Sequence, residues 1–262
     1  MQMPTEFVKN MIRKTCPPWL QHKLRHSYLS RKLIKNRQSP ELEVLLLKKF
    51  ISAGDSVADI GANIGLYTKE LSSLVGESGQ VYAFEPISEN FAILETIIHN
   101  IPSSNIRSFR AALGSQLGLK DMVIPDLSDF SGYYLAHLAQ VGESGRRQTV
   151  DVFTLDDLWK KGIIETLDFI KCDVEGSELE VIRGGLGLVQ TQQPGWLLEV
   201  SQETSEEVFR LMTGLGYRAF IYDKKFIHTQ SYRVGISSNY FFFHPRSEAW
   251  NRILSELSRE AD

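Results

Sequence analysis

Short apolar runs alternate with amphipathic stretches along most of the chain, and glycine or proline marks the change from one to the next. The apolar runs predict seven strands, at residues 56–60, 81–85, 106–113, 167–174, 195–201, 217–222 and 239–244. The amphipathic stretches predict helices near residues 39–50, 66–75, 88–99, 155–159, 177–184 and 203–215. Strands that alternate with helices predict an α/β fold, in which a doubly wound, mostly parallel seven-stranded sheet has helices on both faces. No long helix separates the last two strands, so we expect one antiparallel strand at an edge of this sheet.

Three segments depart from the alternation and predict the limits of the main domain, residues 40–246. Residues 1–39 are basic and contain the helix breakers Pro17 and Pro18, which indicates a basic helical arm. Residues 114–153 hold two strand-like pieces around a polar stretch, and we expect an irregular insertion there. Residues 247–262 form an amphipathic tail and predict a helix packed on the body. Its apolar face would hold Trp250, Ile253, Leu254 and Leu257.

Charge is distributed unevenly between the arm and the rest of the chain. The formal net charge is -3, yet the residues before position 41 hold nine basic side chains and one acid, a net charge of about +8. A basic arm can bind a membrane surface or an acidic partner, or lie along the acidic body of its own chain. Nucleic acid is disfavoured as a partner, because no aromatic-interleaved motif accompanies the charge.

The composition is that of a globular protein, with 42% apolar and 23% charged residues. Cys16 and Cys172 lie far apart and match no disulfide or thiolate-metal pattern, which favours a reducing compartment. No apolar run reaches the roughly 18 residues that a bilayer span needs, and residues 1–21 lack the apolar core of a signal peptide. We therefore expect a soluble, cytoplasmic protein. Nothing in the sequence indicates its oligomeric state.

A glycine-bearing turn follows the first predicted strand and opens into a helix. It carries Asp59, Gly61, Asn63 and Gly65 at alternate positions. Glycine allows a sharp turn and the close approach of a ligand to the backbone, and asparagine tolerates the positive φ that a third glycine often supplies here. The Asp59 carboxylate suits the ammonium group of an amino-acid-bearing cofactor and would repel a dinucleotide pyrophosphate.

The second predicted strand ends in an acid, Glu85, 24 residues after Gly61. In doubly wound sheets an acid at this position accepts hydrogen bonds from ribose hydroxyls. The turn and Glu85 together predict that the chain binds an adenosyl cofactor.

The chain resembles the FkbM family of S-adenosylmethionine-dependent methyltransferases over roughly residues 40–245. The matching segments are residues 57–68, 83–86 and 168–180, with weaker matches at 154–158, 198–200 and 239–241. The Asp-Val-Glu-Gly run at residues 173–176 is the most specific part. The resemblance implies a Rossmann-like class I methyltransferase fold, S-adenosyl-L-methionine as cofactor, and usually transfer to an oxygen of a sugar or secondary metabolite. The basic arm and residues 126–147 lie outside the pattern, so the identity of the acceptor is not implied.

Asp173 and Glu175 follow the fourth predicted strand, which in the common strand order lies beside the first. Both would then flank the point where ligands bind. Three roles are open for Asp173: general base to a hydroxyl, partner of the cofactor's ammonium, or ligand of a divalent ion together with Glu175. The alternative is that both acids merely cap the next helix, whose dipole favours them. Lys171 shares a side of the strand with Asp173, and we expect it to be an ion-pair partner.

The candidate site residues fall into two groups. The catalytic candidates are Asp173 and Glu175. The cofactor-binding candidates are Asp59, Gly61, Asn63, Gly65, Glu85 and Asp173. Weaker candidates are Glu199, at the end of a strand, His137, and the aromatic residues Phe130, Tyr133 and Tyr134 of the insertion.

The leading hypothesis is an S-adenosylmethionine-dependent methyltransferase that acts on a hydroxyl of a small-molecule acceptor. A nicotinamide-dependent oxidoreductase is the alternative that the fold allows, although Asp59 and the lack of a Tyr-x-x-x-Lys pair argue against it. A third hypothesis is an inactive methyltransferase-fold module that docks through its basic arm. His99, His228 and His244 show no metal-ligand spacing, and a divalent ion held by Asp173 and Glu175 leaves metal dependence open.

Overall fold

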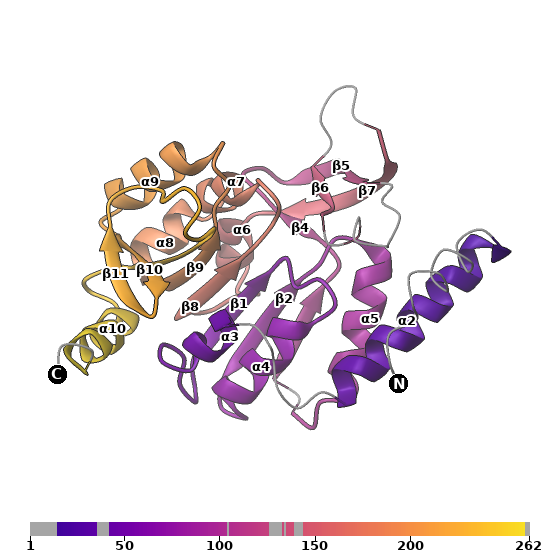
Figure 1. Ribbon diagram of the computed structural model, residues 1–262, viewed down its shortest axis with the longest axis horizontal. Helices are drawn as coiled ribbons and strands as arrows, with labels where there is room; N and C mark the ends of the chain where they lie inside the picture. Colours follow the sequence, from indigo (N-terminus) through magenta and orange to yellow (C-terminus); the bar gives the residue numbers. More distant parts are fainter. Residues whose placement is uncertain are drawn as a thin grey trace.

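The computed structural model describes residues 15–35, 42–103, 105–125, 133, 135–138 and 144–259. Its centre is one eight-stranded sheet between two layers of helices, and a smaller four-stranded sheet stands beside it (Figure 1). The predicted doubly wound α/β fold is therefore confirmed. Ser39, the expected first residue of a helix, lies outside the described residues.

The large sheet has the strand order β11-β10-β12-β9-β8-β1-β2-β3. Its strands are β1 (Ser56–Ile60), β2 (Gln80–Phe84), β3 (Ile106–Phe109), β8 (Phe169–Cys172), β9 (Gly195–Glu199), β10 (Arg218–Asp223), β11 (Lys225–Thr229) and β12 (Asn239–Phe243). The five strands from β3 to β9 pair in parallel, whereas β12 pairs antiparallel with β9 and β10, and β11 pairs antiparallel with β10.

The antiparallel part of the sheet is larger than the sequence pattern predicted. The sheet has eight strands in place of seven, and the antiparallel strand expected at the edge, β12, lies between β9 and β10 while β11 forms the edge. The pattern missed β11 because only Lys224, with φ of 61°, separates it from β10. Such tight turns are usually marked by glycine or asparagine, and this one is not.

Helices cover both faces of the sheet, because alternate strand residues are apolar on both sides. Val57 and Val81 pack with one layer, and Ala58 and Ile60 with the other. The first layer contains α3 (Leu42–Leu47), α4 (Leu66–Val75), α5 (Ser88–Ile98) and α10 (Glu248–Arg259). The second contains α6 (Leu155–Lys160), α7 (Glu178–Arg183), α8 (Leu186–Gln192) and α9 (Ser205–Gly214).

The strand order reverses between β1 and β8. From β1 it passes through β2 to β3, and from β8 it passes to β9 on the other side. The loops that follow β1 and β8 therefore diverge and leave a crevice at the carboxyl ends of these strands, which is where doubly wound sheets bind ligands.

The expected insertion at residues 114–153 contributes most of the second sheet. Its order is β4-β7-β5-β6, with β4 (Ala112–Leu113), β5 (Gly118–Ile124), β6 (His137–Leu138) and β7 (Arg146–Phe153). The side chains of Met122, Ile124 and Val150 pack with Ile87, which follows β2. The small sheet is thereby attached beside the crevice.

Both ends of the described chain pack on the body. The basic helix α2 (Pro18–Lys35) lies alongside α5 (Figure 1), and Leu33 packs with Ile93 and Ile97. In α10, Ile253 is buried, whereas Leu254, expected on the same apolar face, is 43% exposed. No helix in the described ranges combines the length and the apolar character that crossing a bilayer requires. An anionic partner for the arm stays a prediction.

Phe50, in the turn after α3, joins the first helical layer to the antiparallel strands. It is fully buried, and its ring centroid lies 5.2, 5.5 and 4.8 Å from those of Phe226, Phe241 and Phe243. We expect Phe50→Ala to lower the free energy of unfolding by about 3–5 kcal/mol, because the cavity cannot be refilled by three rings held in strands. Urea denaturation followed by circular dichroism measures the change.

Leu45→Ala is the matched control, because Leu45 lies on the adjoining α3 and is 51% exposed. It should change the same free energy by no more than about 0.5 kcal/mol. Equal midpoints for the two variants would show that the phenylalanine cluster does not hold this layer.

Candidate functional site

The turn between β1 and α4 takes the shape that its glycines and asparagine predicted. Gly61, Asn63 and Gly65 have φ of 76°, 51° and 91°. The N–H groups of Gly61 and Ala62 both donate to the carbonyl of Phe84, which anchors the turn to β2. A Cβ atom on Gly61 would lie 1.8 Å from the carbonyl oxygen of Asp173, so only glycine lets the two loops approach this closely.

The loop after β8 is held by a buried glutamate, Glu178. Its Oε1 accepts hydrogen bonds from the N–H groups of Val174 (3.3 Å) and Gly176 (3.1 Å). Glu175, between them, has φ of 50°, a strained value for a residue with a side chain. Burial raises the pKa of Glu178. Glu178 was not among the candidates, since an acid in the first turn of a helix is an ordinary feature.

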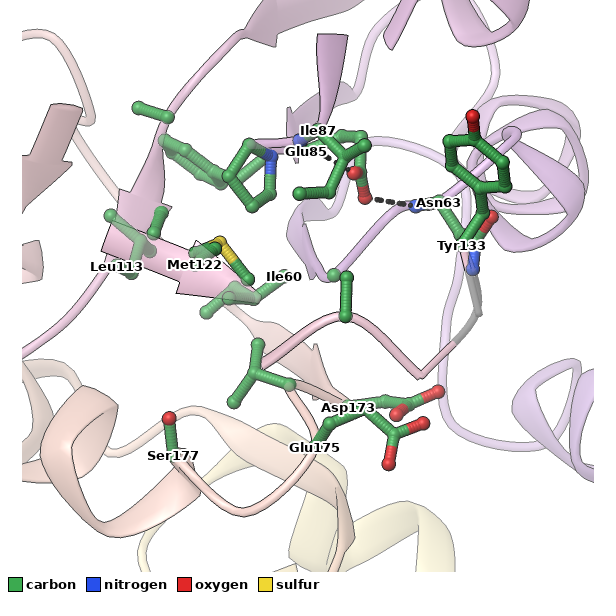
Figure 2. Close-up of a pocket in the computed structure, with 17 residues that line it drawn as sticks. Ile60, Asn63, Glu85, Ile87, Leu113, Met122, Tyr133, Asp173, Glu175 and Ser177 are labelled. Atoms are coloured by element: carbon green, nitrogen blue, oxygen red, sulfur yellow. Dashed lines mark hydrogen bonds between the residues drawn. The ribbon is translucent and has the colours of Figure 1, made fainter. Parts of the chain in front are cut away.

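Glu85 ties the loops after β1 and β2 together. Its Oε2 accepts from the N–H of Asn63 and its Oε1 from the N–H of Ile87, both at 2.9 Å (Figure 2). The side chain is 4% exposed and lines a cavity between the loops after β1, β2 and β8. Burial raises the pKa of Glu85 to about 7, against the effect of the hydrogen bonds.

Lys171 lies buried between two acids. Its Nζ is 3.6 Å from Oδ1 of Asp59 and 3.5 Å from Oδ2 of Asp173, and it donates to the carbonyl of Gly61 at 2.9 Å. Burial opposes its charge, yet the Asp173 and Asp59 carboxylates hold the pKa of Lys171 above its ordinary value. The expected ion-pair role of Lys171 is confirmed.

Asp59 does not occupy the position that we expected from the sequence. Its side chain is fully buried and accepts a hydrogen bond from Thr68 at 2.6 Å. It lines neither of the two cavities that lie at the carboxyl ends of the strands. The register of the parallel strands pairs Asp59 with Lys171, which neutralises the carboxylate inside the sheet. Asp59 therefore reaches the site through its ion pair with Lys171, and its role in cofactor binding stays a prediction.

The first cavity lies between the loops after β1, β2 and β8 and the small sheet, and encloses about 630 Å³ with its mouth included. Figure 2 shows Glu85 and Asn63 on one side of this cavity and Asp173 and Glu175 on the other. The apolar residues of its wall include Ile87, Ala111, Leu113 and Met122. The Oδ1 atom of Asn63 is buried and accepts no hydrogen bond from the described residues.

A second, larger cavity adjoins the first and encloses about 1390 Å³ with its mouth included. Its wall comes from α2, α3, the turn after β1, α4, and the ends of β8, β9 and β12, and its polar or aromatic residues include Lys32, Glu43, Tyr67, Glu199 and Asn239. The two cavities share Gly61, Asn63 and Asp173. A molecule in one cavity would meet a molecule in the other at these three residues.

Glu199 is brought to Asp173 at this junction. Ser238 donates a hydrogen bond to Glu199 Oε1 at 3.1 Å. Burial and the adjacent Asp173 carboxylate raise the pKa of Glu199 to about 8. Glu199 therefore keeps its proton more readily than an ordinary glutamate, and it lies against the Asp173 carboxylate where the two cavities meet.

Most of the candidate site residues line the first cavity, but some line neither cavity. Gly61, Asn63, Glu85, Asp173 and Glu175 line the first cavity, whereas Gly65 caps α4 against Leu94 and lines neither cavity. Tyr133 also lines the first cavity, His137 lines neither, and Phe130 and Tyr134 lie outside the described residues.

Two polar residues of the second cavity, Glu43 and Asn239, were missed by sequence reasoning. They form a hydrogen bond of 3.1 Å across 196 positions, and no local pattern predicts such a contact. Within the described ranges, no group of three or more His, Cys, Asp or Glu side chains is arranged to hold a metal ion.

The chain is similar to known methyltransferases. A family model described as the methyltransferase FkbM domain matches residues 59–219. The chain is 28% identical over 158 residues to the 31-O-demethyl-FK506 methyltransferase FkbM of Streptomyces tacrolimicus, a match that covers 50% of this chain and 59% of the relative. It is 25% identical over 158 residues to the hexuronic acid methyltransferase AglP of Haloferax volcanii, which covers 60% of this chain and 61% of the relative. The chain thus spans about three fifths of the length of these curated relatives.

A solved structure, that of methyltransferase FkbM from Methylobacillus flagellatus, shares the fold. The TM-score is 0.50 at 16% identity, with 84% of this chain and 59% of that chain covered.

Glu85 generates a prediction about stability. Its folded pKa of about 7 exceeds its ordinary value of 4.5, so its contribution to folding is fully present below pH 4.5 and is lost as the pH rises through 7. We expect the unfolding free energy of the wild type, relative to Glu85→Gln, to fall by about 3 kcal/mol over that range. Urea titrations of both proteins at several pH values between 4.5 and 8 measure it.

Glu77→Gln, at an exposed glutamate, controls for the loss of one negative charge. A constant difference between wild type and Glu85→Gln across the pH range would mean that burial does not perturb Glu85.

Proposed function

The chain belongs to the FkbM methyltransferase family, and from that premise we propose that it transfers a methyl group from S-adenosylmethionine to a hydroxyl oxygen of a small-molecule acceptor. The observation that carries the proposal is the meeting of two cavities at Gly61, Asn63 and Asp173. One relative is named for 31-O-demethyl-FK506 and the other for a hexuronic acid. These names support an oxygen acceptor on a sugar or secondary metabolite. They also favour a methyltransferase over the oxidoreductase that the fold alone allowed.

The residues of the first cavity fit an adenosyl cofactor. Glu85 presents a carboxylate that suits ribose hydroxyls, and Ile87 and Met122 supply an apolar wall that suits a purine ring. The buried Oδ1 of Asn63 needs a donor, and a cofactor amine or hydroxyl would supply one. The candidate binding residues Gly61 and Asp173 complete the wall at the junction.

The second cavity supports an acceptor rich in hydroxyl groups. Glu43, Asn239 and Glu199 line it with carboxylate and amide groups, which exchange hydrogen bonds with hydroxyls. Tyr67 adds an aromatic ring, whose centroid lies 4.9 Å from the Lys171 Nζ. Such a wall can orient one hydroxyl of several toward the junction, which is what selective methylation requires.

The cofactor, when bound, supplies a methyl group on a positively charged sulfur, so positioning contributes most of the rate enhancement. The acceptor hydroxyl must also lose a proton. Asp173 lies at the junction, where Lys171 holds its carboxylate, and Glu199 lies beside it. We assign Asp173 as the group that takes this proton, with Glu199 sharing it. Glu175 lines the first cavity and stays a catalytic candidate beside Asp173.

Cofactor binding is the first test of the proposal. The wild-type chain should bind S-adenosylhomocysteine in isothermal titration calorimetry. Glu85→Ala should weaken binding by about tenfold or more, because it removes the carboxylate expected on the ribose and releases the N–H of Asn63. Glu77→Ala, at an exposed acid of the same type, should bind like the wild type. No heat from the folded wild type at millimolar ligand would refute the proposal.

Asp173→Asn provides the test of the chemical role. The amide is the same size but cannot accept the proton, so turnover should fall by about 100-fold or more while the dissociation constant of S-adenosylhomocysteine changes by less than about threefold. Turnover is measured as methyl transfer from labelled S-adenosylmethionine to a panel of hexuronic acids and neutral hexosides. Glu207→Gln, at an exposed glutamate of α9, is the control. Unchanged turnover in Asp173→Asn would remove this residue from the mechanism.

A further inference from the structure

Arg25 of α2 is buried beside the first cavity, although it lies outside the segment that the family model matches. Its Nη2 donates a hydrogen bond of 2.8 Å to Oδ1 of Asn90, and its guanidinium carbon lies 4.2 Å from the centroid of the Tyr133 ring. A buried guanidinium is stable only where its charge has such partners. Arg25 therefore joins α2 to α5 and to the insertion at a single point.

Arg25 also decides how the Asn90 amide is oriented. An arginine can only donate, so the atom of Asn90 that faces it must be the oxygen. The Nδ2 of Asn90 then points the other way, where it donates to the carbonyl of Tyr133 at 2.9 Å and, over a longer 3.4 Å, to Oε1 of Glu85. Asn90 is 1% exposed, so no solvent replaces these bonds.

Tyr133 is the side chain on which this network converges. Its hydroxyl lies 3.1 Å from Nδ1 of His22, and the guanidinium of Arg146 lies 5.6 Å from its ring centroid. Arg146 is itself held by Glu89 at 2.6 Å. Figure 2 shows Tyr133 next to Asn63, at the opposite end of the cavity from Leu113 and Met122. Helix α2, helix α5 and strand β7 thus fix one wall of the cavity.

We propose that Arg25 is a positioning residue of the methyl-donor site: it orients Asn90, and through Asn90 it places Glu85 and Tyr133 for the adenosyl group. The inference rests on the proposed function, because it assumes that the first cavity takes the cofactor. Under this proposal α2 helps to shape the cofactor site, whereas the sequence indicated only a basic arm.

Two substitutions separate positioning from simple packing of α2. Arg25→Met keeps the length of the side chain and removes every donor, so S-adenosylhomocysteine should bind about tenfold more weakly in calorimetry. Asn90→Asp keeps an oxygen facing Arg25, now charged, so α2 stays docked. It removes the donor to Tyr133 and sets a second carboxylate beside Glu85, so binding should weaken at least as much.

The control is Arg31→Met, which removes a guanidinium from an exposed position of the same helix and should bind like the wild type. Arg25→Lys, which keeps one donor, should recover part of the lost affinity. In a double-mutant cycle, Arg25→Met and Tyr133→Leu should weaken binding by less than the sum of their separate effects, because each removes the same contact.

The outcomes distinguish this inference from the function on which it rests. Wild-type affinity in both Arg25→Met and Asn90→Asp overturns the inference and leaves the cofactor assignment standing. Weak binding in Arg25→Met with normal binding in Asn90→Asp also overturns it, since packing of α2 would then be the cause. A folded wild type that does not bind S-adenosylhomocysteine overturns both.

Discussion

The buried ammonium of Lys171 is the constraint on which the site depends. It lies in the sheet between β1 and β8, where a charge is costly unless it is paired. Asp59 on β1 and Asp173 just after β8 approach it, and the carbonyl of Gly61 accepts a hydrogen bond from it. The ion pairs bring the ends of the two strands together at the point where the chain reverses direction across the sheet. They also hold the Asp173 carboxylate at the junction of the two cavities.

Two loops with strained backbones surround this ion-pair cluster. Asn63 and Glu175 both have positive φ, and each is held by a buried glutamate: Glu85 accepts from the N–H of Asn63, and Glu178 accepts from the N–H groups on either side of Glu175. Strain of this kind persists only where surrounding bonds maintain it. The carboxylates that maintain it are desolvated, which raises the pKa of Glu85 and of Glu178. The two buried glutamates thus hold the loops of the site in shape, and their desolvation lowers the stability of the fold around them.

Helix α2, which lies outside the family match, and the small sheet, which lies within it, complete the cavities. Helix α2 supplies Lys32 and Leu33 to the second cavity, and Arg25 to the network behind the first. The small sheet adds Met122 and Leu113 to the wall of the first cavity. The common fold therefore provides the turn, Glu85 and the Asp173 loop, whereas the added segments close the space around them. Differences in such segments offer a physical basis for different acceptors on one fold.

The sequence alone determined the α/β fold, the glycine-bearing turn and the positive φ of Asn63, because each follows from periodicity or from residue types with few conformational options. It also predicted that the Asp59 and Asp173 strands are adjacent, because doubly wound sheets share a common strand order. Tertiary structure decided the rest. The register of β1 against β8 pairs Asp59 with Lys171 and buries it there. A shift of one residue would change this pairing, and no local sequence pattern specifies the register. The hairpin to β11 lacked a turn signal. Contacts such as Arg25 with Asn90, or Glu43 with Asn239, join residues 65 and 196 positions apart. Only the packing of helices on the sheet brings such residues within hydrogen-bonding distance.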